Sequence, residues 1–400
     1  MYSLATHRYQ RHIQGFMTII ERIKREQLIN TLTDEPVMTP DDFISASEAI
    51  DARFWFTTSR SEKRSPFNDL EHLGSMCADS LALLGVEPGA TMLNLLAPEP
   101  HLSAFAANTG ASYLGVKTLN ETFEDYHHVI ETGQATEVDA MVAVPSLAVA
   151  KAREIRVEYG EPNEVFPNLT LGMFGGEMLL PALRETVKTA WGLDEVREFY
   201  GSSELGLVAA GVDETRKLVP QLQHFIIEIE TDETIRDIRD IDAPTEGSVI
   251  CTSPHREAIE LVRYRQGDRI RVYPYDGIPR IEPLGRSDNA INLAGAVVHP
   301  GDVYSAIEDA FGSGTEVVPY VYDDLPTRLE LFVIAAETDR TDAFFEALYA
   351  RNSALRYALE TEERHLIAVT LVDEFDDIPV AIPDGWRNEQ VVFERSATNT

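Results

Sequence analysis

One short stretch of the sequence, EFYGSSELG, places an aromatic ring, two hydroxyls and an acid in a single turn. The hydroxyls and backbone amides of Ser202 and Ser203 can donate hydrogen bonds to an anion such as a phosphate. Glu204 would face a phosphate only if a cation stood between them, and Mg²⁺ prefers oxygen ligands of this kind. Tyr200 can pack its flat face on another ring, and Gly201 lets a bound molecule approach the backbone. The alternative is a buried tyrosine beside an ordinary polar turn.

Three other stretches combine glycine with polar residues. They are GMFGGE (172–177), YRQGDRI (264–270) and GRSDNAINLAG (285–295). Taken alone, Gly-Gly-Glu before a helix is an ordinary loop, Gly-Asp between strands is a turn, and Arg with Asp in a linker is a surface ion pair. Ligands of α/β sheets bind in loops beyond the carboxyl ends of the strands. The elements that precede these stretches therefore decide whether they can form a site.

The middle of the chain alternates helices and strands. Apolar residues recur at helical spacing over 68–84, and a second helix is predicted to begin at Pro181. Leu183, Val187 and Trp191 share the apolar face of that second helix. The runs ATMLNLLA, AMVAVP and NLTLGMF are typical of buried parallel strands. We predict a large layered α/β domain in which polar turns follow the strands.

After Gly285 the pattern changes. A strand (GAVVHP), a helix (302–311), two strands (TEVVPYVY and RLELFVIAA), a longer helix (342–359) and a last strand (HLIAVTLV) follow in that order. The order β-α-β-β-α-β describes a small α+β domain whose middle strands pair antiparallel. The boundary is placed at 285–289, which gives a large domain over 1–285 and a small one over 289–400.

Composition limits the partners that the protein can have. The 400 residues, 44% of them hydrophobic, are enough for two cores, and the formal net charge is −33. The acidic residues are spread along the chain, which argues against a nucleic-acid partner because phosphate backbones bind clustered cations. A diffuse acidic surface is typical of a halophilic protein that stays soluble in a high-salt cytoplasm.

Two further absences set the expected compartment. Cys77 and Cys251 are the two cysteines, so neither a disulfide framework nor a cysteine-based zinc site is expected. No stretch has the length and hydrophobicity of a membrane span, and the first residues lack the apolar run of a signal peptide. We expect a cytoplasmic protein with no membrane partner.

In their order along the chain, the four polar stretches resemble the motifs of the adenylate-forming acyl-CoA synthetase superfamily. LTLGMFGGEMLLPALRETVKTAWGLDEVREFYGSSELG is similar in detail to the phenylacetate-CoA ligase branch, and the resemblance runs from about residue 55 to residue 375. It implies a small C-terminal domain that swings on a hinge between an adenylation and a thioester-forming orientation, so the hinge has a mechanistic purpose.

The resemblance also implies a role for each matched residue. An ionised carboxylate suits the task of binding two ribose hydroxyls, and this role falls to an aspartate. In chain order, the matched residues are Gly175, Gly176 and Glu177 flanking adenine, Tyr200 and Gly201 against the adenine ring, Ser202 and Ser203 at the α-phosphate, Glu204 at Mg²⁺, Asp268 at the ribose, Arg286 near ribose and phosphate, and Asp288 at the hinge.

The predicted phosphate loop departs from the family. The family's loop around the β- and γ-phosphates of ATP is rich in glycine, whereas the matching stretch FTTSRSEKRSP has none. Side chains can still order a phosphate, but the continuous cradle of N–H groups is lost. The hydroxyls and cation that remain are those of Thr58, Ser59, Ser61 and Lys63.

A second departure concerns the C-terminal part. The family has a lysine there that reaches the carboxylate and the α-phosphate, and this chain has no lysine after Lys217. Arg387, in PDGWRNEQ, is the cation that would substitute, with a bulkier fork of donors. The branch's cysteine-containing metal-binding stretch is also missing, and QHFIIEIET with His224 stands there as a plain strand.

The resemblance implies an AMP-forming ligase that uses ATP, Mg²⁺ and coenzyme A. A small carboxylic acid would react with ATP to give an acyl-adenylate, and a thiol would then displace AMP. Ser203, Glu204 and Arg387 would act by positioning and charge stabilisation. The alternative is a non-catalytic relative that binds a nucleotide or acyl-adenylate as a sensor or subunit, which the altered loop and missing lysine favour. The oligomeric state stays open, with a homodimer among the options.

Overall fold

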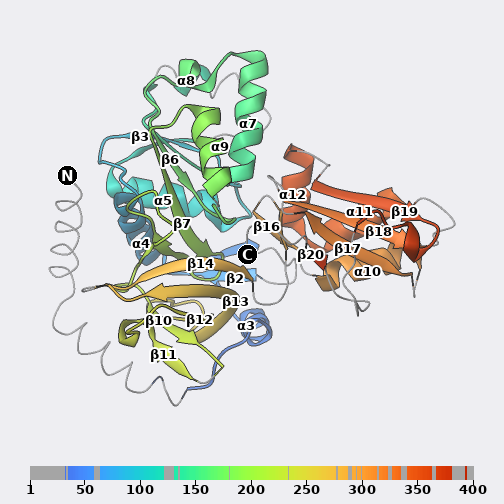
Figure 1. Ribbon diagram of the computed structural model, residues 1–400. Helices are drawn as coiled ribbons and strands as arrows, with labels where there is room; N and C mark the ends of the chain where they lie inside the picture. The colour runs from blue at the N-terminus through green and yellow to red at the C-terminus, as the bar shows by residue number, and fades with distance from the viewer. Residues whose placement is uncertain are drawn as a thin grey trace.

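The computed structural model is shown in Figure 1. It describes residues 32, 35–57, 64–120, 130–133, 136–179, 181–232, 234–275, 278–286, 291–293, 295–298, 300–312, 315–322, 327–334, 340–362, 366–380 and 392–393. Within this part of the chain, no helix combines the length and the low polarity that a membrane crossing requires.

A seven-stranded sheet forms the centre of the large N-terminal part, in the order β4-β3-β5-β6-β7-β8-β9. The first five strands in this order run parallel, and β8 and β9 run antiparallel. The strands are β3 (Thr91–Asn94), β4 (Lys117–Asn120), β5 (Ala140–Ala143), β6 (Leu171–Phe174), β7 (Glu195–Ser202), β8 (Gly206–Ala210) and β9 (Val219–Pro220). The predicted parallel strands are confirmed.

Helices cover both faces of this sheet (Figure 1). On one face, Met92 of β3 packs in a core with α4 (Leu70–Leu83) and α5 (Leu102–Leu114). On the other face, Leu93 packs in a core with α7 (Pro145–Glu158), α8 (Pro162–Val165) and α9 (Pro181–Trp191). Because successive strand residues point to opposite faces and both faces are covered, the central strands β5 and β6 are apolar, whereas the edge strand β4 carries Lys117, Thr118 and Asn120. The apolar face predicted for α9 is buried.

A second sheet lies beside the first and is antiparallel, with the order β11-β10-β12-β13-β14. Of this sheet, the sequence predicted only the strand in QHFIIEIET, which is β10. Its strands are β10 (Ile226–Glu230), β11 (Ile235–Asp237), β12 (Thr245–Ser253), β13 (Leu261–Tyr273) and β14 (Arg280–Arg286), with a 3₁₀ turn at Ile238–Asp240. Helix α3 (Pro40–Glu48) and the ribbon of β1 (Phe54–Thr57) and β2 (Arg64–Phe67) share its core.

The C-terminal elements form a four-stranded sheet in the order β19-β18-β17-β20. β17 and β18 pair antiparallel as predicted, whereas β19 and β20 join them in parallel. The elements are β15 (Ile291–Leu293), β16 (Ala296–Val298), α10 (Pro300–Phe311), β17 (Val317–Tyr322), β18 (Arg328–Ile334), α11 (Thr341–Arg351), α12 (Ser353–Glu362), β19 (Ile367–Val372), a 3₁₀ turn at Phe375–Asp377, and β20 (Val392–Phe393). The domain boundary stays a prediction, because 287–290 fall outside the described residues.

Two predictions for the C-terminal part are wrong in detail. The helix predicted over 342–359 is two helices, because the buried Asn352 interrupts it. Its Oδ1 accepts from Leu355 N at 2.9 Å, as an N-cap does, and its Nδ2 donates to Val297 O at 2.8 Å. The strand GAVVHP does not join the sheet. Its residues in β16 pair with β15 in a separate ribbon, and β20 lies in the sheet instead.

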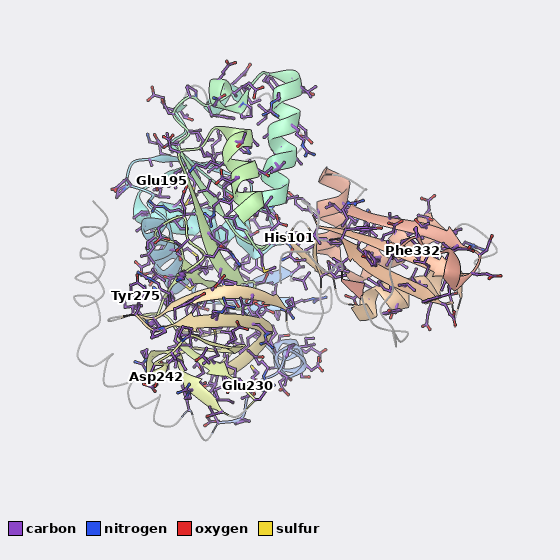
Figure 2. All side chains as sticks on the ribbon, in the orientation of Figure 1. His101, Glu195, Glu230, Asp242, Tyr275 and Phe332 are labelled. Atoms are coloured by element: carbon purple, nitrogen blue, oxygen red, sulfur yellow. The ribbon has the colours of Figure 1, made fainter. Side chains whose placement is uncertain are left out.

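The large part and the C-terminal part touch through a few residues. Leu147 at the start of α7 packs in the same core as β15, β16 and the C-terminal helices. His101, which Figure 2 shows on the side of the large part that faces the C-terminal elements, lies with its ring centroid 5.9 Å from that of Tyr357. The two parts therefore meet beside the carboxyl end of β5, which α7 directly follows.

Candidate functional site

The turn that carries the predicted phosphate and metal residues is a hairpin between β7 and β8. Ser202 pairs with Gly206, and the Ser202 hydroxyl accepts from Leu205 N at 3.3 Å, which leaves its own O–H to donate elsewhere. A Cβ on Gly201 would lie 2.3 Å from the carbonyl oxygen of Gly206. Glycine is therefore required here for the close approach of the two strands, a reason that the sequence did not reveal.

Three of the predicted residues meet in one network. Tyr200 donates its hydroxyl to Asp268 Oδ2 at 2.8 Å, and Arg286 donates to Asp268 Oδ1 at 3.1 Å. Gln266 adds a donor, because its amide contacts the Tyr200 hydroxyl and lies 2.8 Å from Asp268 Oδ2. Burial, together with the neighbouring Asp268 carboxylate, raises the pKa of Tyr200 well above its usual value, so its hydroxyl stays a donor.

The backbone around Asp268 is shaped by a glycine. Gly267 has φ 96°, and a Cβ there would lie 2.5 Å from the Arg286 guanidinium. Asp268 and Arg286 pair directly across β13 and β14. Gly-Asp is thus not a turn between strands, the alternative considered from sequence, but lies within the single strand Leu261–Tyr273. Because Gly267 has no Cβ, the Arg286 guanidinium can lie against it and reach the Asp268 carboxylate.

Glu204 lies within the turn between β7 and β8 and is buried. Its Oε1 accepts from the hydroxyl of the buried Tyr264 at 3.2 Å. Within the described residues, no group of three or more His, Cys, Asp or Glu side chains is placed to hold a metal ion. Mg²⁺ commonly binds one or two carboxylates and completes its shell with waters and substrate phosphates. A lone Glu204 therefore fits an ion that arrives with a nucleotide.

The loop after β6 lies at the same sheet edge as the hairpin, because β6 and β7 are parallel neighbours. Gly175 is buried, and a Cβ there would lie 2.4 Å from the ring of Phe199. Gly176 has φ 88°, and its carbonyl accepts from the side chain of Asn292 in β15. Glu177 is half-buried. The predicted adenine loop thus also touches the C-terminal part.

Six predicted residues lie outside the part of the chain that the structure describes. They are Thr58, Ser59, Ser61 and Lys63 of the predicted phosphate loop, Asp288 of the predicted hinge, and Arg387. Ahead of and behind the phosphate stretch, Thr57 and Arg64 pair directly in the β1–β2 ribbon.

Three residues of this region were not predicted as site residues. Gln266 and Tyr264 lie within YRQGDRI, so their place in that motif was the available signal. Arg256 had no such signal. Its Nη1 donates to the carbonyl of Glu204 at 2.6 Å, although the two residues are 52 positions apart.

Three histidines, His72, His224 and His255, form a cluster near Arg256. The ring of His72 on α4 lies 4.9 Å from that of His224 and 4.4 Å from that of His255. His224 Nε2 is 2.8 Å from Asp79 Oδ2. Burial, the two neighbouring imidazoles and Arg256 lower the pKa of His72 to about 3. The imidazole of His72 is therefore neutral near pH 7.

Comparisons with known proteins agree with the motifs. No family model matches the sequence. Phenylacetate-coenzyme A ligase of Pseudomonas putida is 25% identical over 242 residues, which are 59% of this chain and 54% of that protein. Acyl-coenzyme A synthetase ACSM2B of Homo sapiens is 31% identical over 160 residues, 36% of this chain and 27% of the relative. The chain thus spans about half the length of the curated phenylacetate ligases that it matches.

Solved structures share the fold. A 2-hydroxyisobutyryl-CoA ligase in complex with 2-HIB-AMP and CoA in the thioesterification state gives a TM-score of 0.67 at 17% identity, with 90% of this chain and 80% of that chain covered. An open conformation of that ligase gives 0.56, and its postadenylation state gives 0.57. The share of this chain that is covered is 90% in all three comparisons, and the thioesterification state gives the highest of the three TM-scores. The chain is thus similar in sequence to phenylacetate-coenzyme A ligases over about half of their length, and it shares its fold with a 2-hydroxyisobutyryl-CoA ligase.

Proposed function

We propose that the chain is an AMP-forming ligase that joins a small carboxylic acid to coenzyme A through an acyl-adenylate. The observation that supports this best is the convergence of Tyr200, Asp268 and Arg286 from three different strands. These are residue types that a nucleoside monophosphate needs: a ring, an acceptor for ribose hydroxyls and a cation. Ligases for phenylacetate, 2-hydroxyisobutyrate and malonate are among the similar proteins.

Each residue of the proposed nucleotide site has a distinct task. A carboxylate has about four acceptor positions and three protein donors already contact Asp268, so two ribose hydroxyls would replace at least one of those donors. Ser202 and Ser203 would donate to the α-phosphate, and Gly175, Gly176 and Glu177 would flank the adenine. Glu204 would hold Mg²⁺ beside the phosphates, and the ion would supply positive charge where negative charge develops.

The proposed reaction has two steps. A carboxylate oxygen of the acid attacks the α-phosphorus of ATP, the bond to the β-phosphate oxygen breaks, and pyrophosphate leaves. The sulfur of coenzyme A then attacks the carbonyl carbon, the thiol proton is lost, and AMP leaves. In this proposal the protein orients the reactants and stabilises charge without a covalent intermediate. Arg387 is the proposed cation of the first step.

The proposal includes movement of the C-terminal part about Asp288, with domains over 1–285 and 289–400. The higher TM-score against the thioesterification state than against the other two states supports a thiol-transfer arrangement for the contacts at Leu147 and Asn292. Movement away from this arrangement would precede adenylation.

The test is pyrophosphate release by the purified chain with ATP, Mg²⁺ and a panel of aromatic and short-chain acids. Assays at low and at high salt are needed because the net charge is −33. Release that depends on one acid class, followed by thioester formation with coenzyme A, is the expected result. Release of pyrophosphate with none of the acids, at either salt level, would contradict the ligase proposal.

A second candidate is a non-catalytic relative that binds AMP or an acyl-adenylate as a sensor or subunit. The observation that favours it is the absence of lysine after Lys217, since a lost cation at a developing charge costs a few kcal/mol of barrier. This candidate predicts measurable AMP binding together with no adenylate from any acid.

A further inference from the structure

Arg256 is a buried cation in the loop between β12 and β13, with 8% of its surface exposed. Its Nη1 donates to the carbonyl of Glu204 at 2.6 Å, and its Nη2 donates to the carbonyl of Pro66. The guanidinium carbon lies 3.6 Å from the centroid of the Phe67 ring. One side chain therefore joins the β7–β8 turn to strand β2, which lies 190 positions away from Arg256 in the sequence.

The charge of Arg256 is weakly compensated for so buried a group. Its Nε is 4.0 Å from Asp69 Oδ1, and among the described residues Nε has no hydrogen-bond partner. Burial lowers the pKa of Arg256 to about 10, although Asp69 opposes the shift, so the side chain remains charged near pH 7. A buried cation is costly unless it is well paired. The guanidinium fork is used mainly to hold two backbone carbonyls.

Arg263 provides an internal comparison, because it is 7% exposed and also reaches a distant backbone carbonyl. It contacts both carboxylate oxygens of Glu228, at 3.0 and 3.1 Å, and donates to Glu35 O at 2.8 Å. The charge of Arg263 is thus neutralised by a carboxylate, and its anchor lies away from the hairpin. The two arginines are about equally buried but make different contacts. Arg263 forms an ion pair away from the hairpin, whereas Arg256 contacts the turn that carries Glu204.

We infer that Arg256 is a positioning residue that fixes the main chain of Glu204 against the β1–β2 ribbon, so that the Glu204 carboxylate is placed for a metal-bound triphosphate. The inference rests on the proposed function. Tyr264 orients the carboxylate and Arg256 holds its backbone, so the two contacts together define where a metal would lie. Supporting contacts of this kind matter because small displacements of a binding group lose much of its effect.

The inference predicts a difference between two nucleotides. AMP has no β- and γ-phosphates and would use Asp268, Tyr200 and the serines at its α-phosphate, whereas ATP with Mg²⁺ would in addition use Glu204 through the metal. Arg256→Lys keeps the charge and loses the fork that spans two carbonyls. It should weaken ATP–Mg²⁺ binding by about tenfold and raise the Mg²⁺ concentration needed for half-maximal ATP binding. AMP affinity should change by less than about threefold.

Arg263→Lys is the matched control, since it removes a fork of the same burial. Calorimetric titrations with ATP–Mg²⁺ and with AMP, and urea unfolding, are measured on wild type and both variants. The expected result is a loss of stability in both variants, with the ATP-specific loss in Arg256→Lys alone. Equal weakening of ATP and AMP, or the same ATP loss in Arg263→Lys, would reduce Arg256 to a structural residue and overturn the inference.

A less disruptive variant keeps the test decisive if Arg256→Lys does not fold. Phe67→Leu removes the aromatic face under the guanidinium and leaves both carbonyl contacts possible. It should show the same ATP-specific loss at about threefold, and ATP and AMP affinities both equal to wild type would overturn the inference. If wild type binds ATP and the variants bind it with the same affinity, only this inference is refuted. If wild type binds neither ATP nor AMP, the proposed function is refuted as well.

Discussion

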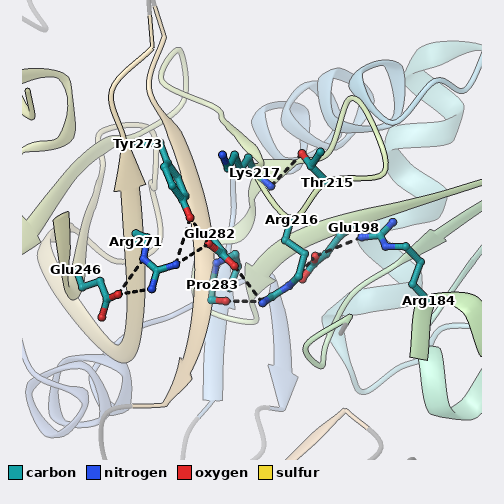
Figure 3. A network of polar contacts seen from close by, with 10 residues as sticks. All are labelled: Arg184, Glu198, Thr215, Arg216, Lys217, Glu246, Arg271, Tyr273, Glu282 and Pro283. Atoms are coloured by element: carbon teal, nitrogen blue, oxygen red, sulfur yellow. Dashed lines mark hydrogen bonds and ion pairs between the residues drawn. The ribbon is translucent and has the colours of Figure 1, made fainter. Parts of the chain in front are cut away.

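Two polar networks cross strands β7, β13 and β14, and they are built differently. In the first, a tyrosine hydroxyl, an amide and a guanidinium all point at one carboxylate, that of Asp268. In the second, cations and anions alternate, as Figure 3 shows. Glu198 of β7 lies between Arg184 at 3.8 Å and Arg216 at 3.5 Å, and Arg216 continues to Glu282 at 3.3 Å.

The alternating network, which we name the charge ladder, continues from Glu282 through Arg271 to Glu246 on β12. Each carboxylate of the ladder lies between two cations or at its end, so the charges compensate one another without a ligand. The Asp268 carboxylate instead collects several donors at the edge where the predicted site residues meet. Several donors that converge on one carboxylate indicate a binding site, whereas cations and anions that alternate indicate a structural link between sheets.

The largest effect is expected in the ladder. Glu198 is 2% exposed, and Glu198→Gln would leave the buried Arg184 and the half-buried Arg216 without their shared counter-charge. Removing one partner of a buried ion pair costs about 3 kcal/mol of unfolding free energy. Urea unfolding should show this loss, while calorimetry at a temperature where the variant is folded should show unchanged AMP affinity. Weakened AMP binding with intact stability would erase the distinction between the networks.

The converse is expected for Asp268→Ala. It removes the proposed ribose acceptor and should weaken AMP binding by about 1–3 kcal/mol, the range for hydrogen bonds to a charged group. Glu282→Ala is the matched control, because its side chain is 16% exposed against 18% for Asp268 and lies on the neighbouring strand. Calorimetry should find a clear loss for Asp268→Ala and almost none for Glu282→Ala. Equal AMP affinity in Asp268→Ala and wild type would remove the ribose assignment.

The two networks also differ in how far the sequence predicted them. Tyr200, Asp268 and Arg286 were predicted because each lies in a short motif that resembles a motif of the adenylate-forming superfamily. The ladder was not foreseen, because Glu198, Arg216 and Glu282 come from separate stretches with no common pattern. Arg256 was missed for the same reason. Its partners are 52 and 190 positions away, and such contacts arise only when the chain folds.

The elements of the fold also differ in how well the sequence predicted them. The parallel strands β3, β5 and β6 were predictable because both of their faces are covered, which makes them largely apolar. β13 was hidden because one strand carries Arg263, Arg265, Asp268, Arg269 and Arg271, and its polar side chains resemble a loop. The break at Asn352 was hidden because its stabilising partner, Val297, comes from a distant ribbon.

The histidine cluster belongs to neither network, and it is expected to make stability depend on pH without changing AMP binding. Burial and the neighbouring His224, His255 and Arg256 lower the pKa of His72 to about 3, from the 6.5 of an unperturbed histidine. Between these two values the unfolded chain binds a proton that the folded chain does not. Stability is therefore fully present above about pH 6.5 and is lost as the pH falls through this window.

His72→Gln should remove this dependence, and the effect is the smallest of the three. For one such group, the loss between pH 7 and pH 6 is about 0.7 kcal/mol. Urea unfolding at pH 8, 7, 6 and 5 should give a steeper fall for wild type than for His72→Gln, with the two curves parallel above pH 7. AMP affinity of the folded protein should be the same in both at pH 7, because His72 is in neither network. Identical pH slopes would mean that His72 is accessible to protons in the folded chain. A change in AMP affinity would mean instead that the cluster communicates with Asp268, and global stability would then no longer be separable from the site.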